Sequence, residues 1–182
     1  METSEAQRLA NQMLANAHEI LSVCQGVDEE TASSAPAGRW SPKEVISHLL
    51  GPDGIGMLPS FQAFLQMDTP LLEIETENPF FSERRSNMSF GDLLDQFESE
   101  YEGIADLVAN LADEQLGRRA HIPMLRDTPS GEYPTLAEWI EAIASYHLGM
   151  HIDQMREILR TLQESAAPHR IDSEFEERIG IY

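Results

Sequence analysis

The chain has 182 residues, which suits a single domain with a substantial buried core. Its 32 acidic and 12 basic side chains give a formal charge of −20, which argues against nucleic acid or an anionic membrane as a partner. The single cysteine excludes an internal disulfide framework and suits a reducing compartment. The sequence has no recognisable leader and no apolar run of the roughly 20 residues that span a bilayer. We therefore expect a cytoplasmic protein with one domain over residues 1–182.

The first predicted element is an amphipathic helix over residues 3–25. Its apolar side chains recur at helical spacing: Leu9, Met13, Ala17, Ile20, Leu21 and Cys24. Because Cys24 lies on this stripe, we expect a buried structural thiol rather than a nucleophile. Residues 28–39 then form a predicted polar linker.

The second predicted helix has a well-marked start. Ser41 is a typical N-cap, followed by a proline and by the capping-box residue Glu44. His48 lies two turns into the helix. Pro52, within the GPDG sequence that follows, should kink or break the helix, because it removes a backbone hydrogen bond and clashes with the preceding turn. The apolar run over residues 57–67 resumes the helix, and the break itself could line a cavity beside His48.

Two long connections flank the third predicted helix, which runs from the N-cap Ser89 to about Leu111. Residues 68–88 show no sustained period, and loops of this length are commonly functional or carry a crossover. Residues 113–134 form the second connection. The first connection holds Arg84 and Arg85, and the second holds Arg118 and Arg119. These basic pairs could attract an anionic substrate, or they could be ordinary surface residues.

The last predicted helix runs from Thr135 to Leu162 and begins with another capping box. It carries His147 and His151 at a spacing of four, which places them about 40° apart around the helix axis. Both histidines fall in the middle of the apolar stripe that should face the core. Residues 163–182 are a predicted polar, acidic tail. Four long helices with little strand signal indicate an all-α bundle, in which sites form between facing helices.

Histidines at this spacing can chelate one metal ion, and His48 could supply a third imidazole. Three imidazoles with an open position would suit Zn²⁺ or Ni²⁺ better than Ca²⁺ or Mg²⁺. The spacing alone leaves an alternative open, namely core histidines satisfied by hydrogen bonds. Asp53 and His121 are weaker candidates for membership of the same pocket.

Two segments, WSPKEVISHLL and GEYPTLAEWIEAIASYHLGMHIDQMREIL, resemble the DinB/YfiT-like family of helical metalloproteins. The family pattern is a Trp-Ser helix start leading to a first histidine, then H-x-x-x-H-x-x-Q in the last helix. The matching positions are Trp40, Ser41, His48, His147, His151 and Gln154. The resemblance implies a four-helix bundle in up-down-down-up order, with residues 68–88 as the crossover between helices two and three. The GPDG break and the tail depart from the pattern and leave the substrate open.

The resemblance also implies a function. Relatives include metal-dependent transferases that use low-molecular-weight thiols such as bacillithiol or mycothiol, and proteins described as metal-dependent hydrolases. We therefore expect a transferase or hydrolase that acts on a small electrophile, and a homodimer. Gln154 could orient a ligand or be a buried amide satisfied by backbone. Glu44 could act as a general base near His48, although its capping role already explains it. The alternative is a metal-binding, stress-associated protein without turnover.

Overall fold

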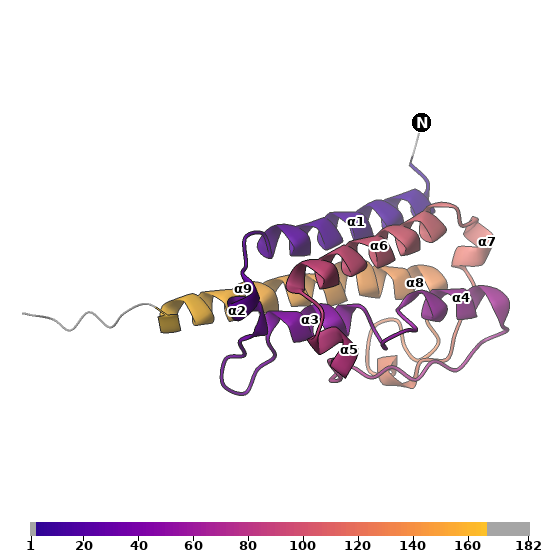
Figure 1. Cartoon of the computed structure of the whole chain (residues 1–182). Coiled ribbons are helices and arrows are strands. Elements are labelled where there is room, and N and C mark those ends of the chain that lie inside the picture. Colours follow the sequence, from indigo (N-terminus) through magenta and orange to yellow (C-terminus); the bar gives the residue numbers. More distant parts are fainter. Residues whose placement is uncertain (1–2, 167–182) are drawn as a thin grey trace, which may run out of the picture.

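The computed structural model describes residues 3–166, and this part of the chain is helical without a regular strand (Figure 1). The long helical stretches are α1 (Glu5–Val23), α3 (Pro42–Leu49) with α4 (Leu58–Gln66), α6 (Phe90–Ala109), and a last stretch that begins with α8 (Leu136–Glu141). Short helices lie in the connections: α2 (Glu29–Ser33), α5 (Glu83–Ser86), α7 (Asp113–Leu116) and the 3₁₀ turn η1 (Pro123–Leu125). No helix within residues 3–166 combines the length and the apolar character needed to cross a bilayer.

The long helices enclose one apolar core. α1 packs against α6 and against the last stretch, and α3 packs against the same two partners. The fully buried residues include Leu9, Met13, Ile20, Leu49, Phe97, Tyr101, Ile104, Met155 and Ile158. The buried Tyr101 hydroxyl donates to the Leu49 carbonyl oxygen at 3.2 Å, which satisfies a polar group at the end of α3.

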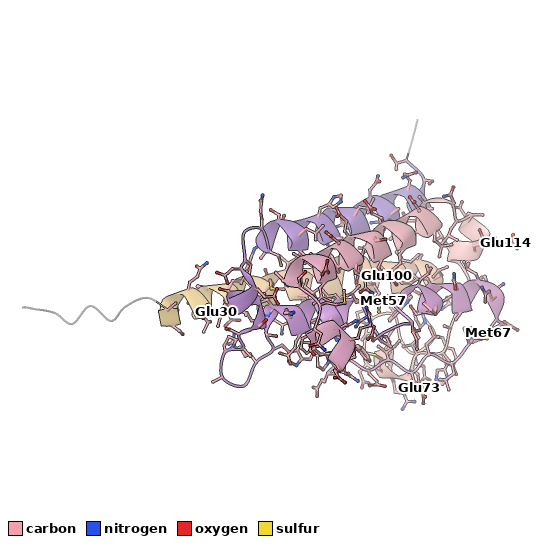
Figure 2. The ribbon with its side chains drawn as sticks, viewed as in Figure 1. Glu30, Met57, Met67, Glu73, Glu100 and Glu114 are labelled. Atoms are coloured by element: carbon pink, nitrogen blue, oxygen red, sulfur yellow. The ribbon has the colours of Figure 1, made fainter. Side chains whose placement is uncertain are left out.

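The predicted capping boxes and the predicted break in the second helix are confirmed. The Ser41 and Thr135 side chains accept hydrogen bonds from the backbone N–H groups of Glu44 and Glu138. The carboxylates of these glutamates in turn accept from the backbone N–H groups of Ser41 and Thr135. Between α3 and α4, Gly51 has a φ of 70°, and a Cβ there would come within 2.8 Å of the Met57 sulfur. α4 begins where the carboxylate of Glu100, on α6, accepts from the backbone N–H of Met57 at 2.7 Å (Figure 2). The break is thus held by the neighbouring helix.

The last stretch differs from the uniform α-helix predicted over residues 135–162. Between α8 and α9 (Leu148–Ala166) lies a π-helical segment, η2 (Ala142–His147). π-helical turns are rare and often occur at functional sites. The side-chain amide of Asn16, on α1, donates to the Ala144 carbonyl oxygen at 2.6 Å. α9 also extends to Ala166, into the range predicted as a tail, whereas residues 167–182 lie outside the described residues.

The predicted polar linker over residues 28–39 contains a short helix, α2, that the sequence analysis did not predict. α2 is held by Lys43, whose buried ammonium donates to the Glu29 carboxylate and to the Met88 carbonyl oxygen, both at 2.6 Å. Glu29 also accepts from the backbone N–H of Phe90, the first residue of α6, at 2.7 Å. A buried lysine paired in this way ties α2 to the starts of α3 and α6.

Candidate metal centre

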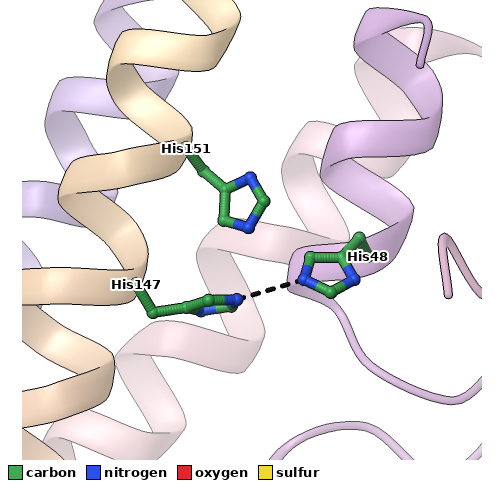
Figure 3. Close-up of side chains that lie close together, drawn as sticks. All are labelled: His48, His147 and His151. Atoms are coloured by element: carbon green, nitrogen blue, oxygen red, sulfur yellow. Dashed lines mark hydrogen bonds between the residues drawn. The ribbon is translucent and has the colours of Figure 1, made fainter. Parts of the chain in front are cut away.

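Three histidines from two parts of the chain converge between α3 and the last helical stretch (Figure 3). His48 lies in the last turn of α3, His147 ends η2, and His151 lies in the first turn of α9. The Nε2 atoms of His48 and His147 are 3.1 Å apart, and ring nitrogens from all three side chains lie within 4.8 Å of one another. The structure thus brings together the three histidines that the sequence analysis singled out, and the group could hold a metal ion.

Hydrogen bonds on the far side of two rings fix which nitrogen faces the centre. The Nδ1 atom of His48 donates to the Asn78 carbonyl oxygen at 2.8 Å, and a carbonyl can only accept. The Nδ1 atom of His151 lies 2.6 Å from the Gln154 side-chain oxygen, which is also an acceptor. With the protons on Nδ1, the Nε2 atoms of both rings present lone pairs to the centre. Gln154 therefore positions His151, whereas Asn78 was not found from the sequence.

The three imidazoles are uncharged at neutral pH. Burial lowers the pKa of His48, and burial together with the neighbouring histidines lowers the pKa of His147 to about 3 and that of His151 to about 4. Nδ1 of His147 and Nε2 of His151 are buried and have no hydrogen-bond partner. The Nε2 atoms of His48 and His147 share one hydrogen bond, and Nε2 of His151 lies beside them without a partner. Imidazole nitrogens gathered in this way are ligands that suit a divalent cation of borderline softness, so the residues present fit a metal.

An aromatic and backbone frame surrounds His48. The ring centroids of Trp40 and Phe80 lie 5.0 and 6.2 Å from that of His48, and the Phe80 ring is tilted by only 10° from it. Phe80 has a φ of 48°, a left-handed conformation that is uncommon for a bulky residue. The Asn78 side-chain oxygen accepts from the Phe80 N–H at 2.8 Å, and the Ser47 hydroxyl donates to the Phe80 carbonyl oxygen at 3.0 Å. These bonds attach the segment 78–80 to α3.

A buried arginine fastens the same loop to the broken end of α3. Arg85 is 0% exposed, and its Nη1 donates to the carbonyl oxygens of Ser47 at 2.8 Å and Gly51 at 2.6 Å. Its Nε lies 3.5 Å from the carboxylate of Asp53, which also accepts from Arg84. The hydrogen bond from Arg84 is the main reason why the pKa of Asp53 falls to about 2. We call Asp53, Arg84 and Arg85 the clamp.

The second arginine pair also bonds to the backbone. Arg118 donates to the carbonyl oxygens of Phe64 and Met67, at the C-terminal end of α4, and the bond to Met67 measures 2.6 Å. Arg119 donates to the Tyr133 carbonyl oxygen. Both pairs therefore have structural partners, which makes attraction of an anionic substrate unnecessary to explain them.

A cavity of about 930 Å³ reaches the histidines. His48 and His147 are among its lining residues, and most of the others are apolar. Asp53 and His121, the weaker candidates, are not among its lining residues: Asp53 belongs to the clamp, and His121 stacks on Tyr133 with ring centroids 4.7 Å apart. The Glu44 carboxylate accepts from the Ser41 backbone N–H at 2.7 Å and hydroxyl at 2.9 Å, as its capping role requires.

The single cysteine lies in the core, away from this chemistry. Cys24 is 2% exposed, and burial raises its pKa to about 12. A thiol with such a pKa is protonated at neutral pH and is a poor nucleophile. The expectation of a structural thiol agrees with this environment.

Comparisons with known proteins agree with this fold. A family model described as the DinB superfamily matches residues 12–155. Among solved structures, YfiT from Bacillus subtilis aligns over 90% of each chain with a TM-score of 0.71 and 15% sequence identity. That protein is described as a probable metal-dependent hydrolase with an unusual four-helix bundle topology. At this identity the likeness concerns the fold alone. No curated protein matches the chain.

Proposed function

The chain belongs to the DinB superfamily, and from this premise we propose that it is a metal-dependent enzyme with an open site of three histidines. The reaction would be transfer of a low-molecular-weight thiol to a small electrophile, or hydrolysis of one. The description of the YfiT structure as that of a probable metal-dependent hydrolase supports the second reaction. The observation that carries the proposal is the convergence on one point of three uncharged imidazoles, of which those of His48 and His151 are buried and that of His147 is half-buried.

In this proposal His48, His147 and His151 hold a divalent ion, and Zn²⁺ or Ni²⁺ suits imidazole ligands best. Such an ion supplies Lewis acidity, which makes a water or thiol nucleophile available at neutral pH. Gln154 acts as a positioning residue, because it holds the Nδ1 proton of His151 and so keeps Nε2 turned inward. Asn78 does the same for His48 through its backbone carbonyl. A catalytic role for Glu44 stays a prediction, since its carboxylate is bound to Ser41.

Metal content tests this proposal directly. Protein purified without a nickel column should contain about one Zn or Ni ion per chain, and His147→Ala and His151→Ala should lose it without unfolding. The matched control is His121→Ala, because His121 lies outside the groups of residues that could hold a metal ion and its loss should leave the metal content unchanged. Absence of stoichiometric metal, with no uptake when Zn²⁺ and Ni²⁺ are offered, would overturn the proposal.

A metal-binding protein without turnover is the second candidate. It is favoured by one observation: the cavity's acidic lining residues, Glu73, Glu75 and Asp127, are all exposed, and the Glu44 carboxylate is committed to the helix cap. A general base beside the histidines is therefore not evident among residues 3–166. Removal of metal by a chelator separates the candidates, because a structural ion contributes directly to the free energy of folding whereas a catalytic ion should leave a folded, inactive bundle.

Three broader expectations belong to this proposal. The up-down-down-up order is supported by the neighbours of α1, which packs mainly against α6 and α9. A cytoplasmic location is supported by the single, unpaired cysteine. A homodimer is expected from the family resemblance, and sedimentation of the purified protein would test it.

A further inference from the structure

The mouth of the cavity is built from exposed apolar side chains. Among the described residues, seven large apolar side chains stand exposed, and five of them line this cavity: Ile55, Leu71, Met124, Tyr146 and Met150. Tyr146, beside His147 in η2, is 76% exposed. Exposed apolar side chains gathered at one opening are typical of a surface that receives an apolar ligand or partner.

The charged side chains that line this cavity all have one sign. Glu73, Glu75 and Asp127 line the cavity, whereas no lysine or arginine in the described part of the chain does so. Figure 2 shows Glu73 on the outer loop, away from the core of the bundle. The arginines of the clamp and Arg118 are engaged elsewhere, and the whole chain carries a formal charge of −20. An anion at the mouth of this cavity would therefore meet acidic side chains without a basic side chain to pair with, and only an ion held by the histidines would attract it.

From these observations we infer that the cavity receives a substrate with an apolar body and no net negative charge, whose reactive end lies against His48 and His147. The inference rests on the proposed function, because it takes the histidine end as the reacting end. The inference also limits which low-molecular-weight thiol the proposed transferase could use. A thiol cofactor carrying free carboxylates would be repelled at the mouth, whereas a neutral thiol or a water nucleophile would not.

Two dyes with a shared skeleton test the charge preference. N-phenyl-1-naphthylamine is neutral, and 1-anilinonaphthalene-8-sulfonate adds one negative charge to the same rings. Both are titrated by fluorescence into the full chain at low salt, in metal-free protein, because a bound divalent ion would add its own attraction for the sulfonate. We expect the neutral dye to bind at least ten-fold more tightly than the sulfonate. This ratio of the two dissociation constants should shrink as salt screens the acidic groups.

A matched pair of variants locates the binding. Tyr146→Lys places a cation at the mouth of the cavity. It should strengthen binding of the sulfonate and so reduce the preference for the neutral dye several-fold. Tyr133→Lys makes the same change at a tyrosine that is 45% exposed and is not among the lining residues, and it should leave the ratio unchanged. Because both tyrosines are exposed, neither substitution should unfold the bundle, and circular dichroism checks this.

Equal or tighter binding of the sulfonate would overturn the inference, as would a ratio that Tyr146→Lys and Tyr133→Lys change alike. A dimer that takes up neither dye and dissociates in Tyr146→Lys would also overturn it, since the mouth would then be a contact between chains. Failure of the metal proposal is separately visible as missing Zn or Ni, and it leaves dye binding to metal-free protein unaffected.

Discussion

Replacing Arg85 by methionine should destabilise the fold strongly. Arg85 is 0% exposed, and its guanidinium donates to the carbonyl oxygens of Ser47 and Gly51. Methionine fills a similar space but donates no hydrogen bond, so both carbonyls and part of the Asp53 carboxylate lose a buried partner. A buried acceptor left unsatisfied costs about 1–3 kcal/mol, and two carbonyl oxygens lose their donor, whereas Asp53 keeps its hydrogen bonds from Arg84 and Ser82. We expect a loss of about 3–5 kcal/mol in the free energy of unfolding.

Arg84 provides the control at the adjacent position. It also pairs with Asp53, but its side chain is 53% exposed, and exposed pairs contribute at most about 1 kcal/mol. Urea denaturation of Arg85→Met and Arg84→Gln, followed by circular dichroism, compares the two directly. Zinc affinity should also fall about ten-fold in Arg85→Met, because the loop that supplies the acceptor for His48 is released. Destabilisation of Arg85→Met by less than about 1 kcal/mol, equal to that of Arg84→Gln, would refute the argument that burial decides the contribution.

Three further predictions concern the centre and its surroundings. Gln154→Ala removes the acceptor that orients a metal-binding histidine and should weaken zinc about 10–100-fold in a chelator competition, whereas Gln163→Ala, exposed on the same helix, should not. Gly51→Ala should lower the free energy of unfolding by about 1–3 kcal/mol, and by more than Gly54→Ala, since both glycines have positive φ but only the former would place a Cβ in contact with its surroundings. Equal losses in urea denaturation would contradict the role of that contact. The pKa of His147, about 3 in the fold, lies below 6.5, so the unfolded chain binds more protons in acid and the metal-free protein should lose stability as the pH falls from 7 to 4. Urea midpoints across this range should slope less in His147→Leu, and parallel slopes would count against a buried neutral imidazole.

Local rules were enough to predict the elements that carry the site. The N-caps at Ser41 and Thr135 depend on residues within one turn, and the spacing of His147 and His151 depends on helical periodicity alone. The contact of these histidines with His48 joins distant parts of the chain, so helical spacing cannot predict it. The sequence indicated it through the family resemblance. The structure brings all three together.

The residues that support the site were harder to predict for physical reasons. Asn78 acts through its backbone carbonyl, which any residue type could supply, so its identity carries no signal. Arg85 resembled a surface arginine because its burial is possible only with acceptors from α3 and the GPDG break, which lie far away in sequence. The π-helical turn depends in the same way on α1, whose Asn16 bonds to a carbonyl within it.

That π-helical turn has a consequence for comparison within the family. A π turn closes its hydrogen bonds at i→i+5, one residue further than an α turn, so η2 accommodates a residue that a plain α-helix would not need. It also shifts the angular register of α8 relative to α9, which carries His151. A relative whose last helix is an uninterrupted α-helix should therefore present the same residues to the core before and after this position. Its helix should reach that arrangement with one residue fewer. An alignment of such relatives should place a single-residue gap within 142–147, just before the second histidine of the centre.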